Sequence, residues 1–223
     1  MKRKSFLQSV NWFEKFIELL VVVIGITLAF VVDRSYEKYR NRKEADLYLS
    51  SLEIDLKADL VQLDSLLKKL NTDQAHLKRF ISLHPGKKIE PDSLQVYLQS
   101  LSNLGLFKIR QGSFRALQSS GKFDLMASFE MRRKMFRYYH SADELEVFQS
   151  ALQNYFDRFV VPVLIENLDM ETGRPLDRHF FRSVKFRNIA SGYWSLRNQQ
   201  IELCREIRKK AEELKAEIER SGL

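Results

Sequence analysis

The sequence holds a single cysteine, Cys204, among its 223 residues, so it has neither a disulfide framework nor a cage of thiolate metal ligands. Only eight glycines and four prolines are present, which is little turn chemistry for a sandwich of many strands or a doubly wound sheet. Hydrophobic residues make up 44% of the chain and charged residues 30%, which excludes a disordered polymer. The composition therefore predicts a helical and basic protein, with a formal net charge of +8.

The sequence also lacks the motifs of common enzymes. No metal-binding spacing connects its four histidines, His76, His84, His140 and His179. A glycine-rich phosphate loop, a dinucleotide fingerprint and a nucleophile elbow are all absent. We interpret Asp55 and Asp59, four residues apart, as a solvated or bundle-edge pair, and Cys204 as a half-buried small hydrophobe. The sequence therefore predicts no enzymatic activity, no cofactor and no metal.

One long uncharged run lies near the N-terminus. Residues 19–32 carry no charge, and aromatic and apolar residues extend the apolar face back to Trp12. A helix from Trp12 to the end of that run spans about 30 Å, the thickness of the hydrocarbon core of a bilayer. Trp12 and Phe13 then lie at the headgroup level. We therefore expect a retained transmembrane anchor over residues 12–33, behind a basic flank of residues 1–11. A cleaved signal peptide and a buried or interfacial helix are the alternatives.

Three residues inside the anchor have further interpretations. Glu18 lies one turn inside its edge and near Lys15, as an interfacial carboxylate does, and a packing or proton-linked role in an oligomer is the alternative. Gly25 and Ala29 form a weak small-xxx-small contact candidate. The basic residues on the two flanks are almost equal in number, so they do not set the orientation. We expect the rest of the chain to lie on one side of a bacterial cytoplasmic membrane.

A leucine repeat follows the anchor and a charged stretch that has no glycine or proline. Leucine recurs every seven residues at Leu49, Leu56, Leu63, Leu70 and Leu77. Such spacing favours packing of one helix on another. Asp59 and Asp73 occupy companion positions, and we expect both to stay wet at a bundle edge, because burial in a tight two-stranded seam is costly. The pattern predicts an amphipathic stalk helix over residues 34–83 that packs in a bundle, with an intermolecular coiled coil as the alternative.

Residues 84–223 are predicted to complete this bundle. A loop is expected at residues 84–91, and helix caps are expected at Asp92 or Ser93, Ser113, Ser128 and Ser183. Pro162 is expected to kink or end the first of the two long helices, and residues 107–110 alternate as an extended segment does. The expected partners of the leucine repeat are Leu196, Leu203, Ile207 and Leu214. The fold class is therefore all-α, an N-terminal transmembrane helix continuing into an elongated antiparallel helical bundle.

Charge is distributed in two opposed blocks. Residues 108–137 hold eight basic and two acidic side chains, whereas residues 141–171 hold seven acidic and one basic. Such blocks usually pair within a bundle or between subunits. An anionic lipid surface is a weaker alternative for the basic block. Nucleic acid is not favoured, because no recognised binding module is present.

Two segments resemble a family of uncharacterised bacterial single-pass membrane proteins of the Bacteroidetes type, known as a domain of unknown function. The first is residues 17–33, where Glu18 and the Ile24-Gly25-Ile26 step match the family's anchor, although Ile17 replaces a glycine and Asp33-Arg34-Ser35 replaces its usual exit. The second is residues 113–146, with a Ser-Ser-Gly turn, an apolar pair and a helix ending in Tyr-Tyr. The resemblance implies a membrane-anchored architecture and brings no reaction or ligand with it.

These features lead to two functional hypotheses. The first is a non-enzymatic, membrane-anchored helical protein that acts through protein–protein interaction, as an accessory or scaffold subunit. Its partners are then membrane lipid and either another protein or a second copy of the chain. The second is a membrane-tethered sensory bundle that binds a small ligand between its helices, of a kind that the sequence does not identify.

Overall fold

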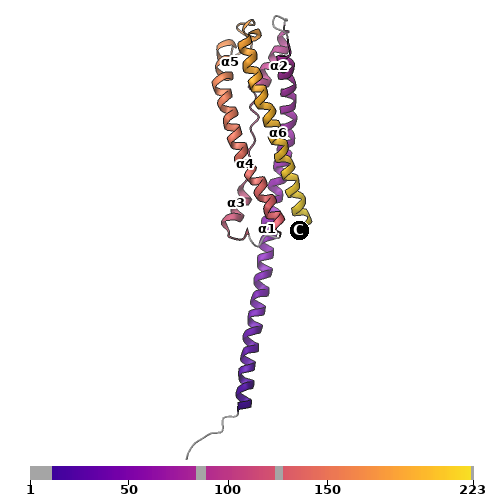
Figure 1. Ribbon diagram of the computed structural model, residues 1–223, viewed down its shortest axis with the longest axis vertical. Coiled ribbons are helices and arrows are strands. Elements are labelled where there is room, and N and C mark those ends of the chain that lie inside the picture. The colour runs from indigo at the N-terminus through magenta and orange to yellow at the C-terminus, as the bar shows by residue number, and fades with distance from the viewer. Residues whose placement is uncertain (1–11, 84–88, 124–127, 222–223) are drawn as a thin grey trace, which may run out of the picture. The chain divides into compact units, whose positions relative to one another are not determined.

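A computed structural model describes residues 12–83, 89–123 and 128–221. The basic flank of residues 1–11 and most of the expected loop at residues 84–91 lie outside the described residues. The chain divides into two compact units, residues 1–47 and 48–223. Every regular element of the described residues is helical apart from a single β-bridge between Leu168 and Pro175, so the all-α expectation is confirmed (Figure 1).

The first helix, α1, runs without interruption over Trp12–Ile81. The expected anchor and stalk are therefore one continuous helix. Its N-terminal part is long and apolar enough to cross a membrane, and none of this apolar stretch is buried inside the structure. The large apolar side chains of residues 12–32 are exposed, including Trp12 and Phe13.

The remaining helices belong to residues 48–223, together with the C-terminal part of α1. They are α2 (Pro91–Ser102), α3 (Gly112–Ser119), α4 (Phe129–Tyr155), the π-helix η2 (Phe156–Val160), α5 (Val161–Asn167), the 3-10 helix η3 (Phe180–Arg182) and α6 (Val184–Arg220). Pro162 lies in the first turn of α5, directly after the π-helix η2. The helical run continues past the proline to Asn167, so the expectation that Pro162 ends the long helix is wrong.

Two of the expected caps are confirmed. The hydroxyl of Ser128 accepts a hydrogen bond from the backbone N–H of Met131, and that of Ser183 from Phe186. The other two caps are wrong. Helix α2 begins directly at Pro91, whose fixed φ suits a first helical position. Helix α3 begins at Gly112, before the expected Ser113, and has no side-chain cap.

The three long helices of residues 48–223 alternate in direction. Arg208 on α6 pairs with Asp64 on α1, while Gln74 further along α1 donates to the Trp194 carbonyl near the start of α6, so these helices are antiparallel. Helix α4 is also antiparallel to α6. A fourth column returns between them and consists of α2, a non-helical stretch and α3 (Figure 1). The sequence predicted the parts of this column, but not that they lie between the long helices.

The leucine repeat lies in the core of this bundle. Leu49, Leu56, Leu63, Leu70 and Leu77 are all buried. The expectation that Asp59 and Asp73 stay wet is wrong, because their exposed fractions are 0% and 9%. Both carboxylates are buried because the interrupted column supplies hydrogen-bond donors to them.

Candidate functional site

The non-helical stretch between α2 and α3, residues 103–111, is the centre of the candidate site and is called the extended segment below. Its side chains alternate, with Leu106 and Lys108 exposed and Phe107 and Ile109 buried. This alternation confirms the extended structure expected at residues 107–110. Gly105 has a φ of +59°, and a Cβ there would lie 2.7 Å from Cδ2 of Leu70, so both the backbone conformation and the space require glycine.

Buried side chains of α6 hold the first half of the extended segment. The Tyr193 hydroxyl donates to the Asn103 carbonyl at 2.7 Å, and Nη1 of Arg197 donates to the Leu104 carbonyl at 2.8 Å. The amide of Gln200 donates to the Gly105 carbonyl at 2.8 Å. These three α6 side chains replace the backbone partners that a helix or a sheet would supply.

The same α6 side chains are coupled to one another and fully buried. The Arg197 guanidinium lies 5.0 Å from the centre of the Tyr193 ring and also donates to the Tyr193 hydroxyl. Burial raises the pKa of the Tyr193 hydroxyl to about 12 and lowers the pKa of Arg197. On α1, Asp73 accepts a hydrogen bond from the amide of Asn103. The cluster therefore fixes the start of the extended segment from two sides.

Residues of α1 and α4 hold the second half. The side-chain amide of Gln149 accepts from the Phe107 N–H at 2.7 Å and donates to the Phe107 carbonyl at 2.9 Å. Asp59 accepts from the backbone N–H of Arg110 at 3.1 Å and from its guanidinium at 2.6 Å. The Tyr138 hydroxyl donates to the same carboxylate at 2.7 Å, and burial raises the pKa of that hydroxyl well above its ordinary value.

A surface groove of about 770 Å³ lies along the extended segment, α3 and the middle of α4, and is called the α3–α4 groove below. Its lining includes Leu106, Lys108, Gln111, Arg115, Glu146 and Gln149. A second hollow of about 300 Å³ shares Gln111 and Arg115 with it and continues toward Phe136 and Tyr139. In this groove the extended segment, which is held by the buried polar residues, presents side chains to a cavity.

The part of the chain that the structure describes has neither a cluster of metal-ligating side chains nor an exposed thiol. The described residues contain no group of three His, Cys, Asp or Glu side chains that could hold a metal ion. Cys204 is completely buried rather than half-buried as expected, because it faces the core side of α6. Burial raises the pKa of its thiol to about 11.

The other residues singled out from the sequence lie away from the groove. On α6, Ile207 and Leu214 are buried, whereas Leu196 and Leu203 are half-buried. The core face of α6 is completed by residues that the sequence pattern did not select, among them Ala190, Arg197, Gln200, Ile201 and Ala211.

The anchor candidates belong to residues 1–47 and make few contacts. Glu18 accepts from Lys15 at 2.8 Å, as its position suggested. A Cβ on Gly25 would meet nothing within 4 Å. Gly25 and Ala29 lie on the exposed apolar part of α1.

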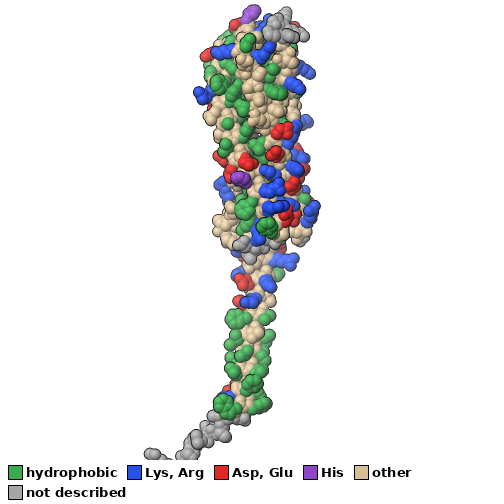
Figure 2. All heavy atoms as spheres, in the orientation of Figure 1, with side chains coloured by type: hydrophobic (Ala, Val, Ile, Leu, Met, Phe, Trp, Pro, Cys, Tyr) green, Lys and Arg blue, Asp and Glu red, His purple; other side chains and the backbone are tan. Residues whose placement is uncertain are grey.

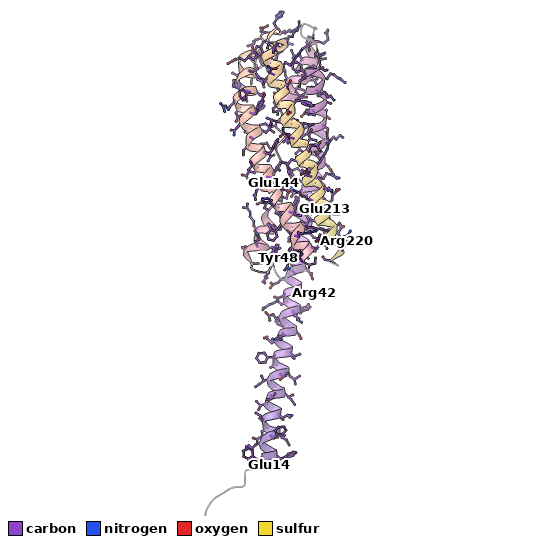
Figure 3. The ribbon with its side chains drawn as sticks, in the orientation of Figure 1. Glu14, Arg42, Tyr48, Glu144, Glu213 and Arg220 are labelled. Carbon is purple, nitrogen blue, oxygen red and sulfur yellow. The ribbon has the colours of Figure 1, made fainter. Side chains whose placement is uncertain are left out.

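Members of both charge blocks pair with α6. Lys134 of the basic block lies 2.7 Å from Glu217, and Glu144 of the acidic block lies 3.8 Å from Lys210. Figure 2 shows blue and red side chains intermingled on this part of the bundle, and Figure 3 labels Glu144 and Glu213 there. The expected pairing within the bundle is present, but the partners differ because α6 lies along α4 and carries charges of both signs.

One of three comparisons with known proteins gave a match. A search of the curated proteins found no match, and a search of the solved structures also found none. A family model described as a family of unknown function, DUF6090, matches residues 18–154. The match covers more than half of the chain and includes the apolar run, the leucine repeat, the extended segment and most of α4. The chain therefore belongs to the DUF6090 family.

Proposed function

We propose that this chain is a non-enzymatic, single-pass protein of the bacterial inner membrane that acts by binding another protein, as an accessory or scaffold subunit. The observation that carries the proposal is that buried polar side chains hold the extended segment in place. Asp59, Tyr138, Tyr193, Arg197 and Gln200 all bond to the extended segment or to each other. These groups stabilise a surface, which is what a binding module needs.

The exposed apolar part of α1 supports the membrane anchor. The large apolar side chains between Trp12 and Val32 are exposed, and burying such side chains is favourable by about 1.5–3 kcal/mol each. Lipid acyl chains would cover a run of this length. A retained membrane anchor thus explains both the length of this apolar run and the exposure of its side chains.

Reporter fusions at the two ends of the chain test the single-pass arrangement. Alkaline phosphatase is active only outside the cytoplasm and green fluorescent protein folds well inside it, so each is fused in turn to each terminus. A single span places the two termini on opposite sides, and the active reporter must differ between them. The same reporter active at both ends contradicts the proposal.

Purification from membranes tests the binding role. The full chain, expressed at its native level and extracted in mild detergent, should elute with a partner protein or as a defined oligomer, measured by light scattering and mass spectrometry. A detergent-resistant partner at fixed stoichiometry supports the scaffold function. A monomer without a partner, both in detergent and after chemical crosslinking in intact membranes, contradicts it.

The α3–α4 groove supports a second candidate function, a sensory bundle that binds a small ligand. Its volume of about 770 Å³ lies within the usual range for small-molecule sites. Ligands that bind only the folded state raise the melting temperature. A metabolite panel that raises the melting temperature of the full chain, but not that of an Arg115→Ala variant, supports this candidate. If no metabolite in the panel raises the melting temperature, the sensory function is contradicted.

A further inference from the structure

The α3–α4 groove has walls of opposite charge. Lys108 on the extended segment and Arg115 on α3 lie on one wall, and Glu146 on α4 lies on the other. Within the described residues, none of these three side chains forms an ion pair, and Arg115 is engaged only by the side chain of Gln111. A ligand with separated positive and negative groups can pair with both walls at once.

One edge of the extended segment is also open. Phe107 uses its N–H and its carbonyl on Gln149. In contrast, no side chain or backbone among the described residues bonds to the backbone of Leu106 or Lys108. Backbone groups of an extended chain point alternately to its two sides, so those of Leu106 and Lys108 face away from Gln149, to the side where the Arg110 N–H bonds to Asp59 of α1. Gln62 of α1 lines the groove on that side. A second extended chain recognises such an edge by main-chain hydrogen bonds.

The length of the site matches a peptide better than a small molecule. The groove and its neighbouring hollow share Gln111 and Arg115, and together they follow α4 from Phe136 to Gln149. At 1.5 Å per helical residue, this distance is about 20 Å, which equals about six residues of extended chain at roughly 3.3 Å each. The aromatic hollow beside Phe136 offers a place for one apolar side chain.

We propose that the α3–α4 groove binds an extended peptide segment of a partner protein, about six residues long and carrying one acidic and one basic side chain. The acidic side chain pairs with Lys108 and Arg115, the basic side chain pairs with Glu146, and the peptide backbone bonds to Leu106 and Lys108. This inference rests on the proposed binding function and names the surface and the chemistry of the partner.

A random octapeptide library displayed on phage tests the proposal against the full chain in lipid nanodiscs. Selection is carried out on the native protein, with depletion on the variant Lys108→Glu, Arg115→Glu. We expect the enriched peptides to share an acidic and a basic residue at fixed spacing. A synthetic peptide of that sequence should bind about tenfold more weakly to the variant, as the loss of a charge pair implies. Methylation of one backbone amide of this peptide should also weaken its binding.

Two controls keep this result specific. Lys68 is exposed on α1 outside the groove, so Lys68→Glu should leave peptide binding unchanged. A peptide whose acidic residue is replaced by lysine should bind the Arg115→Glu variant better than the native protein. Both groove cations are exposed, so the variants should keep the native circular dichroism and melting temperature. If these variants lose the native circular dichroism or melting temperature, the variant Glu146→Lys tests the opposite wall of the groove instead.

Several outcomes overturn the proposal. Octapeptides that bind native protein and variant equally, or a library without enrichment, exclude a peptide site in the groove. Free metabolites that raise the melting temperature while no octapeptide binds make the occupant a small molecule. If a co-purified partner remains on the Lys108→Glu, Arg115→Glu variant, the scaffold function stands and the groove is not its site. The absence of any partner on the native protein contradicts the function itself.

Discussion

The hydroxyl of Tyr138 donates a hydrogen bond of 2.7 Å to Oδ2 of Asp59, a carboxylate with no exposed surface. The two residues lie 79 positions apart in the chain. Arg110 completes the arrangement with its guanidinium and its backbone N–H. A buried carboxylate thus joins α1, α4 and the extended segment, and it is stable there because each of its neighbours is a hydrogen-bond donor.

Removing this carboxylate should destabilise the bundle strongly. Asp59→Ala leaves the Tyr138 hydroxyl and the Arg110 N–H without their acceptor, and breaking a buried charged pair typically costs about 3–5 kcal/mol. Urea unfolding of the full chain in detergent, followed by circular dichroism, measures the change. The matched control is Asp64→Ala on the same helix, which removes a surface ion pair with Arg208 and should cost less than about 1 kcal/mol. Equal losses in the two variants would contradict the buried network.

The leucine repeat can be tested for its partners. Leu63 is completely buried, so Leu63→Ala should cost about 2–5 kcal/mol. Val61 on the same helix is 72% exposed, and Val61→Ala should change the free energy of unfolding by less than about 0.5 kcal/mol. Because Leu63 is buried within residues 48–223, the melting temperature should not depend on protein concentration. A melting temperature that rises with concentration would favour the intermolecular coiled coil.

Gly192 on α6 should not tolerate a methyl group. A Cβ there would overlap the Tyr155 hydroxyl oxygen and lie 2.8 Å from Cζ of that ring, while the hydroxyl donates to the Ile189 carbonyl at 3.0 Å. Overpacking of this kind costs about 1–3 kcal/mol, which exceeds the gain of up to about 1 kcal/mol in helix propensity. Gly192→Ala should therefore lower the melting temperature.

Two further variants separate overpacking from propensity at this position. The double variant with Tyr155→Phe should recover part of the stability, because the overlapping oxygen is gone. Gly112 on α3 is the control, since a Cβ there would meet nothing within 4 Å. Gly112→Ala should be neutral or stabilise by up to about 1 kcal/mol. A loss of stability in Gly112→Ala as large as in Gly192→Ala would show that overpacking is not the cause.

Stability should fall in alkaline solution. Burial raises the pKa of Cys204 to about 11 and that of Tyr193 to about 12, so the folded chain keeps protons that the unfolded chain releases. Where the unfolded state binds fewer protons, the free energy of unfolding decreases as pH rises. The contribution of these buried groups to the free energy of unfolding is complete below about pH 8.5, where the unfolded thiol is protonated. It is lost as pH rises toward 11 and 12.

Urea midpoints between pH 7 and pH 11 measure this alkaline loss. Cys204→Ala should make the slope between pH 9 and pH 11 shallower, because one of the buried groups that keep their protons is removed. Absorbance at 295 nm should show that the buried tyrosines ionise only as the chain unfolds. A midpoint that rises with pH over this interval would contradict the assigned burial.

The charge blocks illustrate the limit of reading a linear pattern. Opposed blocks at residues 108–137 and 141–171 suggested that they pair with each other. In the bundle, part of each block lies on α4 itself, and successive stretches of one helix cannot face each other. Several of their partners come from α6, where acidic and basic residues are interspersed and therefore gave no signal in a block count.

The sequence by itself determined the local features of this protein. The helical fold, the apolar run near the N-terminus, the buried leucine repeat, the serine caps at Ser128 and Ser183 and the alternation at residues 107–110 all follow from periodicity and capping. Each of these depends on residues only a few positions apart, so a linear pattern contains them.

Only the tertiary structure decided how the extended segment is accommodated. Its backbone needs hydrogen-bond partners, and these come from Asp59, Gln149, Tyr193, Arg197 and Gln200, which lie 42 to 96 residues away from the groups they bind. Asp59 and Asp73 on the apolar stripe were the visible signals. Both were expected to stay wet because burial in a tight seam is costly, and the residues that donate to them lie far along the chain. A buried polar group is stable only when its partner is in place, and the packing of the helices alone brings those partners together.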